Sequence, residues 1–348
     1  MDKVYRVGVV GCGGMGNAHA KWFMASPRTT LVAGADINPE ALAEFASAYG
    51  VTPYADYRAM FARERLDIVC VSTWQSVRAE VVIAAAAAGI GGIFGEKPMS
   101  ASLGEADDMI AACDRAGAKL VVGHQRRFDA RNSEARRLVQ EGLIGEPRAV
   151  LARDGLGLLN RGTHEFDETL YLLGDPQPVW VIGQCSRKTD KWERRVRCED
   201  LCIALIVCDN GVRITYESDL PGPPIERWTL YGSDGLLKRG PDKSLMLLNS
   251  RKAGWQQIML RAPEVHQFDE LIAWLDGAIE THRNNGRRAR VTMELMMALY
   301  ESARLRDVVV LPLTTRANPL DLMVESGDLP VVVPGRYDIR APFPEEGK

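Results

Sequence analysis

The sequence lacks the features that define membrane, secreted and nucleic-acid-binding proteins. It has no apolar run of membrane-spanning length, so we expect no membrane partner. Its 43 Lys and Arg residues are balanced by 46 Asp and Glu residues, and no basic patch is interleaved with aromatic side chains, so we expect no nucleic-acid partner. No signal-peptide pattern precedes the first strand pattern, which favours a cytoplasmic location.

The seven cysteines form no C-x-x-C pair. Most of them lie in apolar segments, where cysteine is typical of a small buried side chain in a reducing compartment. We therefore predict no metal site. The length of 348 residues suggests two domains, and 46% hydrophobic residues provide enough apolar surface for a sizeable core.

A glycine-rich turn near the N-terminus carries the strongest motif. An apolar run over residues 7–10 leads into Gly11, Gly13 and Gly16, which stand in G-x-G-x-x-G register before a helical pattern. The first glycine allows a tight turn, the second lets a pyrophosphate approach the backbone, and the third lets helix and strand pack closely. The N–H groups that open the helix then face the phosphates. We predict cofactor binding by Gly11, Gly13, Gly14, Met15 and Gly16.

An acidic residue follows at the distance that a dinucleotide site requires. The strand pattern at 30–35 ends at Asp36, twenty residues after Gly16. A carboxylate here can accept hydrogen bonds from the adenosine ribose hydroxyls, and it would repel a 2′-phosphate. The order of strand, turn, helix, strand and acid therefore predicts an NAD site and favours NAD over NADP.

The pattern of elements divides the chain. Residues 1–124 alternate strand and helix patterns, which predicts an α/β Rossmann domain with a doubly wound parallel sheet. We expect an α+β domain with a mostly antiparallel sheet at 125–314, and five prolines predict an extended arm at 315–348. The strand patterns of the second domain lie at 147–153, 178–187, 200–207, 211–218 and 226–232, and two amphipathic helices follow at about 264–281 and 293–306.

Polar side chains follow the predicted parallel strands where these strands end. Thr73 and Trp74 come after the strand at 66–72, and Glu96 and Lys97 come after the next one. Because ligands of a doubly wound sheet bind outside the carboxyl ends of its strands, we expect all four residues to contact the cofactor. Trp74 could instead stack on a sugar ring or cover the following helix.

Lys97 is the most informative single residue. It follows a buried strand almost at once and precedes a proline that stiffens the turn. A cationic nicotinamide nearby, together with partial burial, would lower its pKa, so that it could bind a substrate hydroxyl and help to move its proton. The alternative is a surface charge that steadies a phosphate; we favour the catalytic role.

Three segments together resemble the Gfo/Idh/MocA family of NAD(P)-dependent sugar and cyclitol oxidoreductases. They are the turn at 11–16 with His19 behind it, Gly95–Pro98, and His124–Asp129. The resemblance covers nearly the whole chain, and it implies a Rossmann domain followed by an α/β domain with an open-faced sheet. In the family that sheet often mediates dimers or tetramers, so the resemblance implies a homodimer or homotetramer through the C-terminal sheet.

The family's second signature, D-x-x-x-H-x-x-D, is matched in part by residues 160–167. His164 and Asp167 match and share one helical face, and the resemblance makes His164 the general acid/base. Asn160 stands where the family has an acid. Its amide can position a substrate hydroxyl, but it carries no charge with which to stabilise a protonated His164.

Four other residues are given roles by this comparison or by their place in the chain. Gln125 and Arg126 match positions that line the substrate pocket of the family. We expect Arg127 to anchor the domain junction, and we interpret Arg78, in the first turn of a helix, as a surface charge.

The sequence therefore predicts NAD-dependent oxidation of a secondary hydroxyl of a sugar, sugar derivative or cyclitol to a ketone. Lys97 and His164 would handle the proton, while Asn160, Gln125 and Arg126 would position the substrate. Two alternatives remain open. Transient use of NAD would give net glycoside cleavage or epimerisation, and a non-catalytic sensor on the same fold would need neither Lys97 nor His164.

Overall fold

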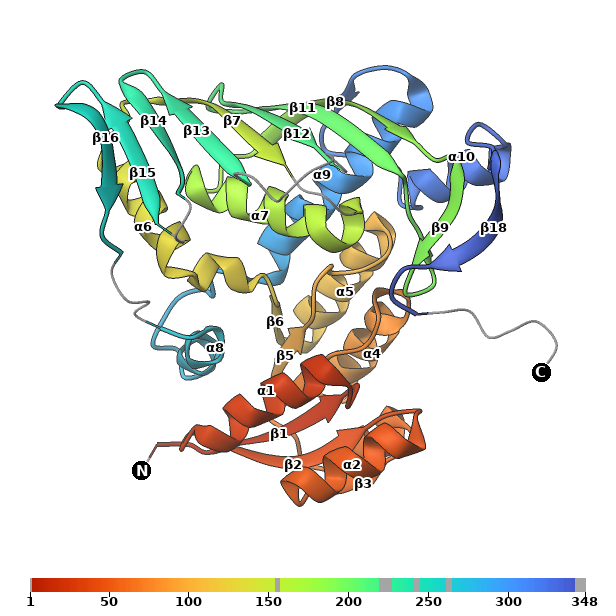
Figure 1. Cartoon of the computed structure of the whole chain (residues 1–348). Helices are drawn as coiled ribbons and strands as arrows, with labels where there is room; N and C mark the ends of the chain where they lie inside the picture. Colours follow the sequence, from red (N-terminus) through yellow and green to blue (C-terminus); the bar gives the residue numbers. More distant parts are fainter. Residues whose placement is uncertain (1, 154–156, 219–226, 241–243, 261–264, 342–348) are drawn as a thin grey trace. The chain divides into compact units, whose positions relative to one another are not determined.

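The computed structural model describes residues 2–153, 157–218, 227–240, 244–260 and 265–341. The chain forms two compact units and passes between them several times (Figure 1). The first unit comprises Met1–Ser100, Glu105–Gly123 and Gln267–Arg287, and the second comprises Ala101–Gly104, His124–His266 and Arg288–Lys348. The helix expected at 264–281 therefore belongs with the first unit, whereas the sequence predicts it within the second domain.

The first unit contains the predicted doubly wound sheet. Its six parallel strands lie in the order β3-β2-β1-β4-β5-β6, which is that of a Rossmann fold. The strands are β1 (Tyr5–Val10), β2 (Thr29–Ala35), β3 (Thr52–Tyr54), β4 (Ile68–Val71), β5 (Gly92–Gly95) and β6 (Lys119–Val122). Strand β3 lies outside the predicted strands. The predicted strand at 66–72 is β4, and the predicted strand before Glu96 is β5.

Five helices alternate with these strands. They are α1 (Gly14–Ala25), α2 (Pro39–Tyr49), α3 (Tyr57–Arg63), α4 (Gln75–Ala87) and α5 (Leu103–Ala116). Helix α2 shows the local cause: the Asn38 side chain accepts hydrogen bonds from the N–H groups of Glu40 and Ala41, and Gly50 ends the helix with φ 65°.

Helix α8 (Gln267–Leu275) completes the core of the first unit. The Phe268 ring lies 4.4 Å from that of Phe23 and 4.6 Å from that of Phe94, measured between centroids. The segment after α8 adds a backbone contact, since the Val122 N–H donates to the Asn284 carbonyl at 3.0 Å. These aromatic contacts explain why a segment so late in the sequence belongs with the N-terminal sheet.

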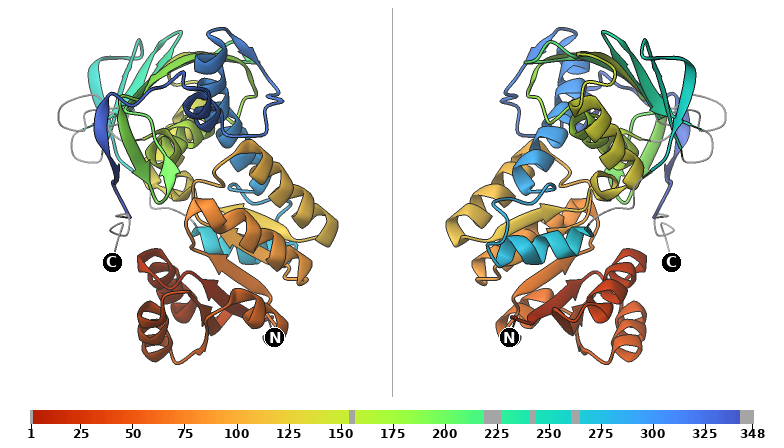
Figure 2. Two further views of the ribbon diagram at one scale, coloured as in Figure 1. Left: turned by 90° about the vertical axis from the view of Figure 1, so that its right-hand side faces the viewer. Right: turned by 90° about the vertical axis from the view of Figure 1, so that its left-hand side faces the viewer.

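The second unit is built on a nine-stranded, mostly antiparallel sheet in the order β16-β15-β14-β13-β7-β12-β11-β8-β17. Helices α6 (Ala130–Gln140), α7 (Thr163–Leu172) and α9 (Gly286–Leu305) cover one face of it (Figure 1), and Figure 2 shows these layers edge-on. The strands are β7 (Pro147–Arg153), β8 (Pro178–Ser186), β11 (Leu201–Cys208), β12 (Arg213–Glu217), β13 (Trp228–Gly232), β14 (Gly235–Arg239), β15 (Leu245–Asn249), β16 (Lys252–Ile258) and β17 (Val309–Val310).

Strand β11 shows how this sheet divides its two faces. Cys202, Ala204 and Ile206 are buried on the helix side, whereas Leu201 and Ile203 on the other face are exposed. This alternation is that of a half-buried strand, and it leaves an outer face with apolar side chains.

The C-terminal residues are more ordered than the predicted extended arm. Helix α10 (Pro319–Ser326) is capped by the Asn318 side chain and ends at Gly327 in a left-handed conformation. Strand β18 (Val333–Asp338) pairs in parallel with β9 (Thr189–Glu193), which also pairs with β10 (Val196–Arg197) in a small three-stranded sheet.

The cysteines and the helices bear on the class of protein. All seven cysteines are buried free thiols. None of the helices in the described ranges is long and apolar enough to cross a membrane.

Candidate active site

The glycine turn has the space that a dinucleotide needs. Gly11 has φ 91°, and a Cβ on it would lie 2.8 Å from the Ser72 carbonyl carbon; a Cβ on Gly16 would lie 2.0 Å from the Gly11 oxygen. A Cβ on Gly13 or Gly14 would meet nothing within 4 Å. Gly11 and Gly16 are therefore required by the fold, whereas the space beside Gly13 and Gly14 at the start of α1 fits a pyrophosphate.

Asp36, at the end of β2, is held beside this turn. Its Oδ2 accepts a hydrogen bond from the Cys12 N–H at 2.7 Å, and its Oδ1 accepts one from the Asn38 N–H at 2.8 Å. Each carboxylate oxygen retains a further acceptor position. The geometry thus fits a carboxylate that receives hydrogen bonds from ribose hydroxyls.

The residues after β4 offer an unused polar atom. The Thr73 hydroxyl is buried and has no hydrogen-bond partner in the part of the chain that the structure describes. Trp74 and Met15 are each more than two-fifths exposed. A buried hydroxyl at the carboxyl edge of this sheet is suited to a polar atom of the cofactor.

Glu96 anchors the loop that carries Lys97. Its Oε1 lies 2.6 Å from His19 Nε2, and its Oε2 accepts the Lys97 N–H at 3.1 Å. Burial by itself would raise the pKa of Glu96, but the hydrogen bond from His19 and the nearby charges of His19, Arg78 and Lys97 hold it below its ordinary value. Glu96 thus braces the loop around Lys97, and its contact with the cofactor stays a prediction.

Arg78 corrects the prediction of a surface charge. Its side chain is buried, and it donates hydrogen bonds to the carbonyls of Thr73 and Pro98. It therefore ties the loop after β4 to the loop after β5. Lys97 itself is partly exposed, and the Lys97–Pro98 peptide is cis.

In the second unit, Asn160 and His164 lie on one buried helical segment. Residues Leu158–Gly162 form a π-helical turn that continues into α7, and both side chains are about one-twentieth exposed. The Leu158 N–H, at the start of the turn, donates to Glu199 Oε1 at 2.6 Å. The other oxygen of Glu199 accepts the hydroxyl of Tyr300 from α9.

Asp167 fixes α7 by contacts with the residues after β6. Arg127 Nε and Nη2 lie 2.8–3.0 Å from its carboxylate, and the ring of His124 lies 3.5 Å away. Burial by itself would raise the pKa of Asp167, but the charges of Arg127 and His124 hold it below its ordinary value. Because Arg127 also binds Asp175 at 2.6 Å, it connects the residues after β6 with α7 and with the segment that follows α7, all within the second unit.

The two predicted pocket residues differ in their surroundings. Arg126 Nη1 forms ion pairs with Glu165 and with Glu168, the latter at 2.8 Å, whereas Gln125 is exposed. Glu199 and Tyr300 were not predicted. Nothing in the sequence points to them, because only the folded second unit brings residues 158, 199 and 300 together.

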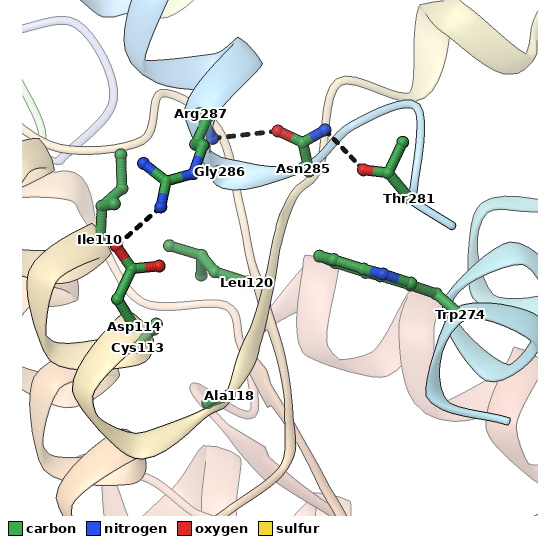
Figure 3. Close-up of a pocket in the computed structure, with 10 residues that line it drawn as sticks. All are labelled: Ile110, Cys113, Asp114, Ala118, Leu120, Trp274, Thr281, Asn285, Gly286 and Arg287. Atoms are coloured by element: carbon green, nitrogen blue, oxygen red, sulfur yellow. Dashed lines mark hydrogen bonds and ion pairs between the residues drawn. The ribbon is translucent and has the colours of Figure 1, made fainter. Parts of the chain in front are cut away.

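A separate pocket of about 180 Å³ lies on the first unit (Figure 3). It is lined by residues of α5, β6 and α8, of the segment that joins α8 to α9, and of the start of α9. Asp114 and Arg287 form an ion pair of 2.8 Å at its rim, and the Asn285 amide donates to the Thr281 hydroxyl. None of the predicted site residues lines it.

Comparison with known proteins identifies the family. The model of the oxidoreductase family with an NAD-binding Rossmann fold, Gfo/Idh/MocA, matches residues 5–124. Myo-inositol 2-dehydrogenase of Thermotoga maritima is 30% identical over 253 residues, which are 66% of this chain and 73% of that protein. The chain belongs to the Gfo/Idh/MocA family. It is thus an NAD(P)-dependent oxidoreductase, and the prediction of NAD as cofactor is confirmed.

Two further comparisons cover nearly the whole chain. D-apiose dehydrogenase of Paraburkholderia graminis is 25% identical over 339 residues, 87% of this chain and 88% of that protein. The WlbA dehydrogenase of Bordetella pertussis, solved with NADH and UDP-GlcNAcA, has a TM-score of 0.75 at 24% identity and covers 89% of this chain and all of that one. The latter confirms the fold of both units.

Proposed function

We propose that this Gfo/Idh/MocA protein oxidises a secondary hydroxyl group of a sugar, sugar derivative or cyclitol to a ketone. The observation that carries the proposal is the position of Lys97, at the same carboxyl edge of the parallel sheet as the glycine turn and Asp36. The names of the two similar dehydrogenases, which act on an inositol and on apiose, support a polyhydroxylated substrate.

The residues of the two units have separate tasks in this proposal. The turn at Gly13 and Gly14 holds the pyrophosphate of NAD and Asp36 holds its ribose; NAD, when bound, supplies the hydride acceptor. Lys97 donates a hydrogen bond to the reacting hydroxyl oxygen, and His164 accepts the hydroxyl proton. Asn160, on the same buried segment as His164, orients a neighbouring hydroxyl through its amide.

The test is NADH formation from NAD⁺ with a panel of sugars, glycosides and cyclitols. Lys97→Ala should lower kcat/KM at least a hundredfold on any substrate found, because a positioned proton-transfer group contributes about 10²–10⁴-fold. Lys21→Ala, which removes an exposed lysine of α1, is the matched control and should match the parent. An equal effect of both variants would contradict the role of Lys97.

The same panel also tests the two alternatives. Asn160 stands where the family has an acid, which favours a reaction other than simple oxidation. The reaction products should therefore be analysed as well as NADH. Cleaved or epimerised product without net NADH would support transient oxidation. Tight NAD binding with no product from any compound would support a sensor.

We also propose that the second unit forms a homodimer or homotetramer through the outer face of its large sheet. Ile203 and Leu201 of β11, Ile182 of β8 and Val310 of β17 are each more than two-fifths exposed on neighbouring strands. A large exposed apolar sheet face is typical of an interface. Ile203→Glu should reduce the mass found by light scattering, whereas Val77→Glu, at an equally exposed residue of α4, should not. A monomeric parent protein would refute this assembly.

A further inference from the structure

The main chain around Lys97 is held by two buried charged side chains of the first unit. Glu96 Oε2 accepts the Lys97 N–H at 3.1 Å, and Arg78 Nη1 donates to the Pro98 carbonyl. Arg78 is 3% exposed and Glu96 is 7% exposed. The chain from the Lys97 N–H to the Pro98 carbonyl is therefore bound at both ends, at the first by an anion and at the second by a cation.

Arg78 also binds the loop after β4. Its Nη2 donates to the carbonyl of Thr73, the residue whose buried hydroxyl is suited to a polar atom of the cofactor. Its stem passes beside the end of β5, because a Cβ on Gly95 would lie 3.6 Å from Arg78 Cδ. One planar guanidinium group thus fixes the distance between the Thr73 loop and the Lys97 loop.

The two acceptors require an arginine. Both are main-chain carbonyls in the loops that follow β4 and β5, which are neighbouring strands, so the sheet sets their positions. A guanidinium group presents several N–H donors in one rigid plane, whereas an ammonium group is a compact charge on a flexible stem. We therefore expect a lysine in place of Arg78 to bind one carbonyl and to lose the other.

Helix α4 has other contacts that hold it on the sheet. Its residues Ala79, Val81 and Val82 are buried, and burial of apolar side chains is sufficient to place a helix. The hydrogen bonds of Arg78 instead reach two loops at the carboxyl edge of the sheet, where the glycine turn also lies. These acceptors indicate a role in the site.

We propose that Arg78 is a positioning residue for the proton transfer, because its two hydrogen bonds set the place of Lys97 relative to the loop at Thr73. This inference rests on the proposed dehydrogenase function. Lys97 must bind the reacting hydroxyl in the orientation that hydride transfer requires, and an error of about 1 Å in such a geometry can lower a rate about a hundredfold. Arg78 acts through Lys97 and not by contact with the substrate.

A double-mutant cycle tests whether Arg78 acts through Lys97. Arg78→Lys, which keeps the charge, is made in the parent protein and in Lys97→Ala, and NADH formation is measured on the best substrate of the panel. We expect kcat to fall at least tenfold in the parent, while KM and the Kd for NAD change less than threefold. In the Lys97→Ala background the same substitution should change kcat less than twofold, because the amine that it displaces is absent.

Arg6→Lys is the matched control. Arg6 also donates to a main-chain carbonyl, that of Arg65 at 2.8 Å, but it lies near the amino end of β1 and therefore at the opposite edge of the sheet. This variant should keep kcat within twofold of the parent. Arg78→Gln, which keeps a donor without the charge, replaces Arg78→Lys if the latter fails to fold, and it should show the same loss of kcat.

Equal losses of kcat in the two backgrounds would overturn the inference, and so would a parental kcat in the Arg78 variant. If no compound of the panel yields NADH, hydrogen exchange of the NAD-loaded protein is measured. The peptide with Lys97, Met99 and Ser100 should exchange at least tenfold faster in Arg78→Lys, whereas the peptide with the glycine turn should not change. Faster exchange would support the positioning role while the dehydrogenase proposal fails, and unchanged exchange would refute it.

Discussion

The Arg127–Asp167 pair holds helix α7, which carries His164, to the residues that follow β6. Both side chains are almost completely buried, so their charges are compensated by each other and not by water. Removing one partner of a buried ion pair leaves the other charge poorly compensated, which costs about 3–5 kcal/mol.

We therefore expect Asp167→Asn to lower the free energy of unfolding by about 3 kcal/mol. This value is at the low end of the range for buried pairs, because Asp175 still binds Arg127. Asp114→Asn is the matched control. It removes one partner of the exposed pair with Arg287, and such pairs contribute no more than about 1 kcal/mol. Urea unfolding of both variants measures the difference. Equal losses would show that burial of the Arg127 pair has no special effect.

The same pair should give stability a defined pH dependence. The pKa of Asp167 is lower in the folded protein than in the unfolded chain. Burial raises it, but the charges of Arg127 and His124 and the hydrogen bonds from Arg127 and Thr292 together lower it by more. Its contribution is therefore present above the unfolded pKa, near 3.9, and is lost as the pH falls through the folded value. The stability difference between the parent and Asp167→Asn should shrink as the pH is lowered from about 6 to about 3. A constant difference across that range would contradict the shift.

Asn160→Asp should change the pH dependence of turnover. The new carboxylate would lie one turn from His164 on the same buried segment, and a neighbouring negative charge raises the pKa of a histidine. Since His164 must be neutral to accept a proton, the acid limb of the rate profile for alcohol oxidation should move to higher pH. Asn160→Gln, which adds no charge, should leave that limb in place. Identical profiles for the two variants would argue against His164 as the base.

Single residues were predictable where a motif fixes their place on a strand end, as for Gly11, Asp36 and Lys97. Arg78 shows why others were not. We expected Arg78 at the surface because it lies in the first turn of its helix. Its side chain is instead buried, where it donates hydrogen bonds to the carbonyls of Thr73 and Pro98. Those acceptors belong to two loops that only the assembled sheet brings together.

At the scale of elements, the π-helical turn at Leu158–Gly162 depends on Glu199 and Tyr300. Glu199→Ala would leave the buried Leu158 N–H and the Tyr300 hydroxyl without their acceptor. Each unsatisfied group should lower the free energy of unfolding by about 1–3 kcal/mol. We expect this variant to lower both stability and kcat, because the turn carries Asn160.

Tyr300→Phe separates these two effects. It removes the hydroxyl and leaves the contact between Glu199 and Leu158, so it should lower stability by about 1 kcal/mol and change kcat less than twofold. Melting temperatures and steady-state rates on the best substrate provide the measurement. An equal loss of kcat in Glu199→Ala and Tyr300→Phe would mean that the contact with Leu158 does not position the turn.

A capped helix can be read from the sequence, since Asn38, Pro39 and Gly50 define α2 by local chemistry alone. Strand β3 and helix α8 show the limit. Strand β3 has three residues and little apolar content, and α8 has a helical pattern that says nothing about which sheet it covers. Its place is decided by the contacts of Phe268, which are not local.

At the scale of the molecule, the C-terminal residues bind the segment that follows the Lys97 loop. The Gly104 N–H donates to the Arg316 carbonyl at 2.8 Å, and the Asn318 amide donates to the Ala101 carbonyl at 3.1 Å. Ala101 comes four residues after Lys97 in the sequence. The C-terminal part thus connects β9, through β18, with this segment.

A truncation after residue 314 should therefore lower the melting temperature by several degrees and lower kcat. Asn318→Ala tests the same contact without removing the chain. This variant should lower the free energy of unfolding by about 1–2 kcal/mol, because it removes both the cap of α10 and the hydrogen bond to the Ala101 carbonyl. Calorimetry and steady-state rates give the result. Full activity and stability in both variants would show that this part of the chain has no role in holding the segment.

The late position of α8 in the sequence has a consequence for synthesis on the ribosome. Residues 124–266 must be translated before Phe268 can cover Phe23 and Phe94, which takes roughly 7 to 30 seconds at about 5–20 residues per second. During that time the N-terminal sheet exists with part of its aromatic core exposed to water. We therefore expect a nascent chain at this stage to bind chaperones that recognise apolar surface, until α8 has emerged and covers these rings.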